Sequence, residues 1–150
     1  MIAAALAPSG DVALHGGTDG IVRLWDFRAE REIAASPGKG WIEAIDRSDD
    51  GRFWISAGRD KTVHMWDAGV KLVRSLHGAT RGIQSAAIAP DGSHVVASGG
   101  GAALLWDAAS GRVRGKLEGE KLGAVRFSRD GARVVAYDAT GFVRVYDVPS

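Results

Sequence analysis

Four times along the chain an apolar, strand-like run ends in an aromatic residue followed by aspartate. The four pairs are Trp25-Asp26, Trp66-Asp67, Trp106-Asp107 and Tyr146-Asp147. They recur at intervals of 41, 40 and 40 residues, and a fixed period of this length indicates a repeat architecture whose units stack on one another. The sequence therefore predicts one domain, 1–150, built from four repeats at approximately 1–41, 42–82, 83–121 and 122–150.

Each repeat also carries a glycine turn between its first two apolar runs. The turn glycines are Gly10, Gly51, Gly92 and Gly131, and aspartate precedes the last three of them. Asp-Gly between apolar runs is a strong hairpin signal, because two-residue hairpin turns need positive φ at both central positions. These turns predict that the first two strands of every unit pair in antiparallel fashion.

The third strand of each unit reads IVRLWD, TVHMWD, AALLWD and FVRVYD, with the alternation expected of strands. A fourth strand is expected at 32–35, 72–76 and 113–117. Only Val148, Pro149 and Ser150 follow the last aromatic-Asp pair. We therefore expect fifteen strands, with three in the last unit.

These units resemble the WD-repeat β-propeller family along essentially the whole chain. The resemblance is carried by the aromatic-Asp pairs, the Asp-Gly turns, and the segments Gly17-Thr18-Asp19-Gly20 and Gly58-Arg59-Asp60-Lys61. It implies an all-β propeller of about four blades, each an antiparallel sheet of four strands except the three-stranded last one. It also implies that Trp25, Asp26, Trp66, Asp67, Trp106, Asp107, Tyr146 and Asp147 are structural repeat positions.

Blades of this family often hold a network of Trp, Ser or Thr, Asp and His. The second unit supplies Ser56, Asp60 and Trp66 but has no histidine before its first strand. We therefore expect water or backbone partners for Asp60, and likewise for Asp19 in the first unit.

The resemblance also predicts a partial or half propeller. Rings of this family commonly close by pairing a fourth strand from one terminus with three from the other, and neither terminus here supplies that strand. We expect a fragment of a larger propeller, or a half-ring that forms a homodimer of eight blades. A compact four-bladed ring is the alternative.

Composition limits the chemistry. With no cysteine, disulfides and thiolate metal sites are excluded, which fits a reducing, cytoplasmic compartment. A net charge of +1 argues against nucleic acid as a partner, and no apolar run reaches the length of a membrane span. The four histidines lack metal-site spacing and no serine lies in a nucleophile elbow. We therefore predict no catalytic residues, no metal and no cofactor.

The candidate partner-binding residues lie in the loops before the first strands and in the turns after the second strands. In a propeller these segments emerge together on one face, around the channel. The candidates are Thr18, Lys39, Trp41, Arg59, Arg81 and Lys121. Trp and Arg are enriched at interface hot spots. In the alternative interpretation, Trp41 packs on a neighbouring blade and the basic side chains are only solvated.

The leading hypothesis is a noncatalytic protein–protein interaction scaffold, part of a larger or oligomeric WD-repeat propeller in signalling or complex assembly. The alternative is an enzyme or a small-molecule-binding propeller that uses the central channel. Carboxylates and histidines converging on the channel would favour the alternative, whereas an exposed aromatic and basic patch would favour the scaffold.

Overall fold

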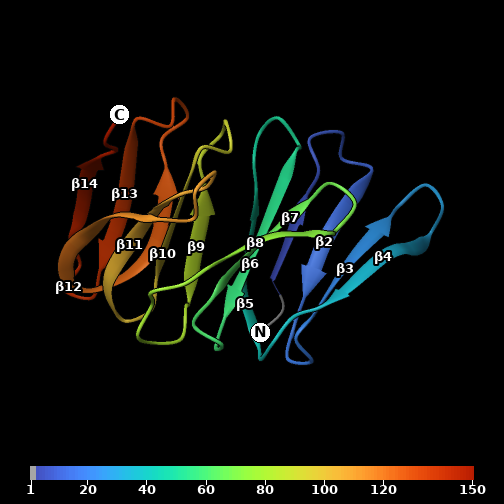
Figure 1. The fold of residues 1–150 in the computed structure, drawn as a ribbon, viewed down its shortest axis with the longest axis horizontal. Coiled ribbons are helices and arrows are strands. Elements are labelled where there is room, and N and C mark those ends of the chain that lie inside the picture. The colour runs from blue at the N-terminus through green and yellow to red at the C-terminus, as the bar shows by residue number, and fades with distance from the viewer. Residues whose placement is uncertain (1–2) are drawn as a thin grey trace.

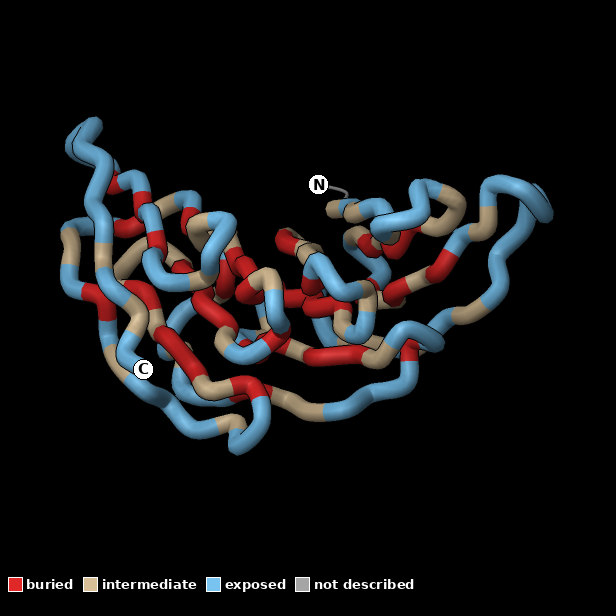
Figure 2. The backbone as a smooth tube through the Cα atoms, turned by 90° about the horizontal axis from the view of Figure 1, so that it is seen from above, coloured by how far each residue is buried: buried red, intermediate tan, exposed pale blue. Residues whose placement is uncertain are grey.

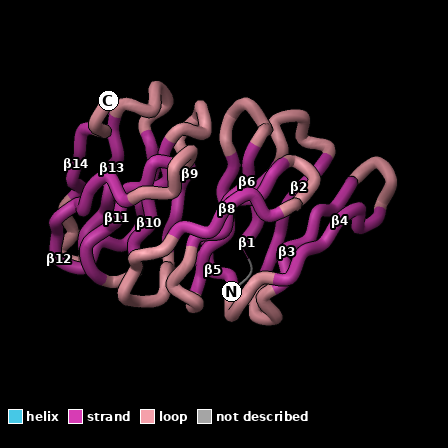
Figure 3. The backbone as a smooth tube through the Cα atoms, viewed as in Figure 1, coloured by secondary structure: helices cyan, strands magenta, loops and turns pink. Residues whose placement is uncertain are grey.

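The computed structural model describes residues 3–150, which contain strands and no helix (Figure 3). The first sheet holds β1 (Ala3–Leu6), β2 (Val12–Gly16), β3 (Ile21–Asp26) and β4 (Arg31–Pro37). The second holds β5 (Ile42–Arg47), β6 (Phe53–Gly58), β7 (Val63–Asp67) and β8 (Leu72–Leu76). The third holds β9 (Ser85–Ile88), β10 (His94–Ser98), β11 (Gly101–Asp107), β12 (Val113–Phe127), β13 (Arg133–Asp138) and β14 (Val143–Asp147). Met1 and Ile2, at the start of the first expected strand, lie outside the described residues.

The six-stranded sheet corrects the expectation of fifteen strands, because the described residues form fourteen. The expected fourth strand of the third unit and first strand of the fourth unit are one strand, β12, which curls from one unit into the next (Figure 1). Its pairing with β11 and β13 shifts register near Leu122, and Lys121 there adopts a φ of 51°. Residues 118–121 offer no proline to end the strand, so these bends turn it without breaking it.

We keep the term unit for each repeat. Unit 1 is β1–β4 and unit 2 is β5–β8. Unit 3 is β9–β11 with the first part of β12, and unit 4 is the rest of β12 with β13 and β14.

The glycine turns have the same geometry in all four units. The turn glycines have φ between 72° and 76°, the left-handed region that favours glycine. The closing backbone bond recurs as Ala7 N–H to Val12, Ser48 to Phe53, Ala89 to His94 and Ser128 to Arg133. The loops are thus longer than the two-residue turn that Asp-Gly suggests, and only the glycine needs positive φ.

Three hydrophobic cores join the units in chain order. Leu14 and Leu24 of unit 1 pack against Trp54 and Trp66 of unit 2. A second core joins unit 2 to unit 3 around Ile55 and Trp106, and a third joins unit 3 to unit 4. The innermost strands β1, β5, β9 and β12 therefore lie side by side.

The result is an open crescent. Seen from above, the units follow one curve with a concave side (Figure 2). Figure 1 shows β4 at one end of the molecule and β14 at the other. Among residues 3–150, no hydrophobic core joins unit 4 back to unit 1.

Candidate protein-binding surface

One rim of the crescent is assembled by contacts between consecutive units. The Ile42 N–H donates to Gly17 O at 3.0 Å, and the equivalent Ile83 N–H donates to Gly58 O at 2.8 Å. Each bond joins the end of the second strand of one unit, or the turn after it, to the start of the next unit. Segments that lie 25 residues apart in sequence therefore share one edge of the fold.

Trp41 and Arg59 form the most distinctive contact on this rim. The Arg59 guanidinium carbon lies 3.8 Å from the Trp41 ring centroid, and Arg59 Nε donates to Glu43 Oε1 at 3.0 Å. Trp41 nevertheless remains 43% exposed. A cation held on an indole face by a carboxylate is already ordered, so a partner would not have to fix it.

Gly58 explains how this contact forms. A Cβ atom at Gly58 would lie 1.8 Å from Trp41 O, so only glycine lets the two strands approach this closely. The next residue, Arg59, donates its N–H to that carbonyl at 3.0 Å. The turn after β6 is thereby anchored directly to Trp41.

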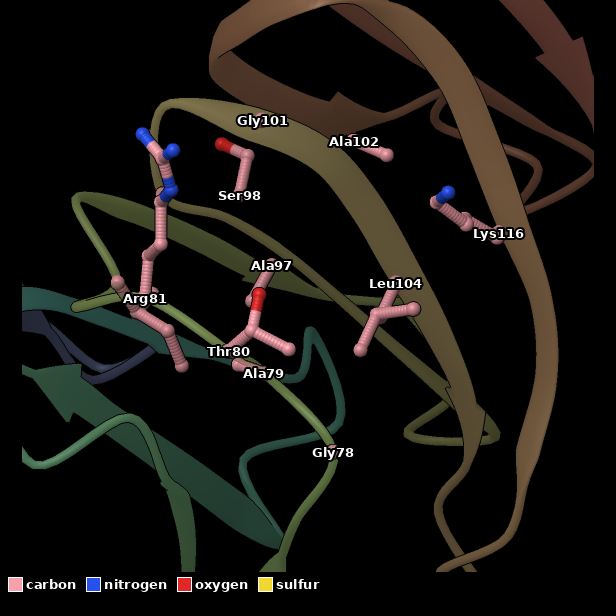
Figure 4. A pocket seen from close by; sticks show the side chains of 12 residues that line it. Gly78, Ala79, Thr80, Arg81, Ala97, Ser98, Gly101, Ala102, Leu104 and Lys116 are labelled. Carbon is pink, nitrogen blue, oxygen red and sulfur yellow. The ribbon is translucent and has the colours of Figure 1, made fainter.

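Two hollows share Arg81, and Arg59 lines the first of them. A hollow of about 380 Å³ is lined by Glu43, Arg59, Arg81, Gly82, Gln84 and Gly99. The second, of about 340 Å³, lies between residues 78–83 and unit 3, and Figure 4 shows Arg81 and Lys116 on opposite sides of it. Its other labelled side chains, including Thr80, Ser98 and Leu104, are neutral.

The remaining candidates lie at different distances from these hollows. Arg81 joins Arg59 in the first one. Thr18 is exposed in the turn after β2, and that turn touches Gly38 and Gly40 on either side of exposed Lys39. Lys121 lies farther along the crescent, at the bend of β12, and lines neither hollow. The structure therefore brings Trp41, Arg59 and Arg81 together, with Lys39 and Thr18 beside them.

A polar cluster lies behind this rim, between units 1 and 2. The Trp66 indole N–H donates to Ser56 Oγ at 2.9 Å. His64 Nε2 lies 2.7 Å from Asp60 Oδ2, and His64 Nδ1 lies 3.1 Å from Ser75 Oγ. The Thr62 N–H supplies the expected backbone partner of Asp60 at 3.2 Å. The expected backbone partner of Asp60 is thus confirmed. His64 on β7 is a further partner that was not expected, and it takes the place of the histidine missing before β5.

The cluster borders a hollow of about 600 Å³ that also reaches Pro37, Leu72 and His77. A Ser–His–Asp line is also the connectivity of a nucleophilic triad. We interpret it as structural, because Asp60 also holds the turn that carries Arg59, and Trp66 belongs to the core between units 1 and 2. The spacing of Asp60 and His64, four residues apart across a turn into a strand, is the sequence signal that could have revealed it.

Asp19 and Asp138 hold the corresponding turns in units 1 and 4. Asp19 accepts the Ile21 N–H at 3.1 Å, as expected, and also pairs with Arg23 at 2.7 Å; the Arg23 hydrogen bond lowers its pKa. Buried Asp138 accepts from Thr140, Phe142 and Arg144. The Thr140 hydroxyl and these donors lower the pKa of Asp138 to about 2. Sequence reasoning missed Asp138, because the position equivalent to Asp19 and Asp60 in unit 4 is Thr140, two residues later.

Three of the four aspartates that close the repeat motifs cap the next turn. Asp26 accepts the Arg28 and Ala29 N–H groups, Asp67 accepts those of Gly69 and Lys71, and Asp107 accepts from Ser110. Asp147 instead pairs with Arg133 at 3.4 Å on the exposed side of unit 4. These local bonds account for Asp26, Asp67 and Asp107 without any role in binding.

Residues 3–150 lack two features of other protein classes. No group of three His, Asp or Glu side chains gathers in a way that could hold a metal ion. The same residues contain no helix that is long and apolar enough to cross a membrane.

Comparison with known proteins identifies the repeats. Residues 31–67 and 70–107 match the family described as WD domain, G-beta repeat, and together they make up half of the chain. Among curated proteins, the chain is 26% identical to eukaryotic translation initiation factor 3 subunit I of Culex quinquefasciatus, over 90% of this chain and 47% of that protein. It is 24% identical to the same subunit of Drosophila willistoni, over 95% of this chain and 50% of that protein. The chain thus spans about half the length of these relatives, and it belongs to the WD-repeat family.

Proposed function

We propose that this chain is a noncatalytic protein-interaction module that serves as a scaffold in a multi-subunit assembly. Membership of the WD-repeat family supports a repeat scaffold that presents loops on one rim. The relatives from Culex and Drosophila are named as subunits of a translation initiation factor, which supports a role among other proteins. The proposed setting is cytoplasmic complex assembly or signalling, with neither nucleic acid nor membrane as a partner.

The observation that carries the proposal is the exposed Trp41–Arg59 contact beside the hollow shared with Arg81. An ordered aromatic with an adjacent arginine is the typical composition of an interface hot spot. The carboxylate that lines this hollow is Glu43, and Arg59 already engages it. The surface therefore best fits a protein segment that places an apolar side chain on Trp41 and carboxylates toward Arg59 and Arg81.

The test compares partner capture by matched variants of the intact chain. Trp41→Ala with Arg59→Ala removes the proposed hot spot, and each such truncation is expected to cost about 2 kcal/mol of binding. Phe27→Ala with Arg28→Ala is the control, because it also removes an exposed aromatic and an arginine, in the turn after β3 at the other end of the strands.

We expect one set of captured proteins to be lost with the first pair and retained with the control, with both variants unfolding at the wild-type temperature. Capture that survives the loss of Trp41 and Arg59 would contradict the proposal. A marked loss of thermal stability in that variant would instead show that Trp41 is a packing residue.

The proposal also includes a homodimer of this chain. Among residues 3–150 the crescent is open, with no hydrophobic core between units 4 and 1, and a second copy of the chain would close it into a ring.

A further inference from the structure

Equivalent side chains are buried in three units and exposed in the fourth. The residue four positions after the turn glycine is Leu14, Ile55 and Val96 in units 1 to 3, and each is fully buried against the following unit. In unit 4 the equivalent residue is Val135, which is 38% exposed. Unit 4 thus keeps an apolar residue at a position that elsewhere packs against a neighbour.

The third strand repeats this pattern. Val22, Val63 and Ala103 are fully buried, whereas the equivalent Val143 is 65% exposed. Val145 is 59% exposed at a position where Leu24, Met65 and Leu105 are buried. Val145 pairs across the strands with Val135, and Val143 pairs with Tyr137, so all four side chains share one side of the sheet. We call Val135, Tyr137, Val143 and Val145 the trailing face.

The opposite end of the crescent has the complementary surface. The closing residues Trp66 and Trp106 are buried against the preceding unit, whereas Trp25 of unit 1 is 36% exposed. Trp25 pairs with Ala13, and Ala13 pairs with Leu6, which is also exposed. Ala13 itself is buried, and we call the exposed pair Leu6 and Trp25 the leading face.

Within the chain, the positions equivalent to the trailing face in units 1 to 3 pack against the next unit. They contact there the positions equivalent to the leading face, and this happens three times. A surface built to cover the trailing face of unit 4 is therefore a leading face, and the leading face of unit 1 is exposed. Figure 1 shows unit 1 at the opposite end of the crescent from unit 4. Uncovered apolar strand faces of this kind mark association sites.

We propose that a second copy of this chain covers both faces, with the trailing face of each copy packed on the leading face of the other. The two contacts are related by a two-fold axis, so the pair closes and does not grow into a filament. The proposal deepens the homodimer named under the proposed function by assigning the two surfaces that form it. It uses none of the residues around Trp41.

The test is retention of an untagged copy by an affinity-tagged copy, with variants on each face. Val145→Glu places a charge on the trailing face and Leu6→Lys places one on the leading face. Val73→Glu is the control, because Val73 is an exposed strand valine of β8 that belongs to neither face. Circular dichroism melts check that all three variants fold.

We expect wild-type and Val73→Glu copies to retain their own kind, and neither face variant to do so. A tagged Val145→Glu copy should retain an untagged Leu6→Lys copy, because that pair keeps one intact contact. Retention of Leu6→Lys by itself would overturn the proposal, since it would show pairing through trailing faces alone. Equal retention by all variants, or none by the wild type, would also overturn it.

Partner capture is scored on the same variants. Trp41 and Arg59 are unchanged in these variants. If a variant no longer pairs but still captures the same proteins, the loss of pairing is independent of the proposed function.

Discussion

The boundary between units 2 and 3 and the free side of unit 4 carry the same kinds of residue in different surroundings. At the inner boundary, Val63 and Met65 meet Val95 and Trp106 and exclude water. On the free side, Val143 and Val145 occupy the equivalent positions and face solvent. The repeat thus specifies an apolar face in every unit, while burial of that face depends on whether another unit follows. Equivalent positions in the repeat should therefore differ in how much they stabilise the fold.

The largest difference is expected between two equivalent tryptophans. Trp66→Ala should lower the free energy of unfolding by about 3–5 kcal/mol, because it empties a site between units 1 and 2 and leaves Ser56 without its donor. Trp25→Ala should cost less than about 1.5 kcal/mol in the unpaired chain, since no unit packs on it in the crescent. Chemical denaturation at low protein concentration measures both, and equal costs would mean that a neighbour covers Trp25.

Two equivalent valines give a matched test on the other side of the sheets. Val63→Ala should cost about 2 kcal/mol through lost burial and a residual cavity. Val143→Ala should stay within about 0.5 kcal/mol in the unpaired chain, as exposed substitutions do. The same denaturation series decides the order, and a reversed ranking would break the comparison.

A smaller effect is expected in the polar cluster of unit 2. Ser75→Ala removes one hydroxyl partner of His64 and should cost about 1 kcal/mol, measured by thermal melting. Hydrolysis of a simple ester by the wild type that disappears in this variant would contradict the structural interpretation, because it would make Ser75 a nucleophile.

Acid sensitivity should mark Asp138 in unit 4. Its folded-state pKa of about 2 lies below the usual aspartate value, so the carboxylate stabilises the fold above about pH 4. This contribution should be lost as the pH falls from about 4 toward 2. Asp138→Asn should therefore be less stable at neutral pH and should change less across that window. Acid titrations followed by circular dichroism measure this, and parallel curves for the two proteins would refute it.

The sequence predicted the repeats, the turn glycines and most strand positions, because these depend on local chemistry that recurs every 40 or 41 residues. It missed the continuous β12, since nothing local distinguishes a bent strand from two strands joined by a short loop. It also missed His64 and Asp138 as turn partners, because each replaces a family residue from a different position in the chain. The contact between Trp41 and Arg59 required the backbone approach at Gly58, which depends on pairing of β5 with β6. The use of Trp41, Arg59 and Arg81 in binding remains a prediction.

The central claim is that the two uncovered faces of the crescent form one interface between two copies. Static light scattering of the unmodified chain across a dilution series tests it most directly. We predict twice the mass of one chain at high concentration, a fall toward the mass of one chain on dilution, and an unfolding temperature that rises with concentration. A monomer that keeps one mass and one unfolding temperature throughout the series would contradict the claim.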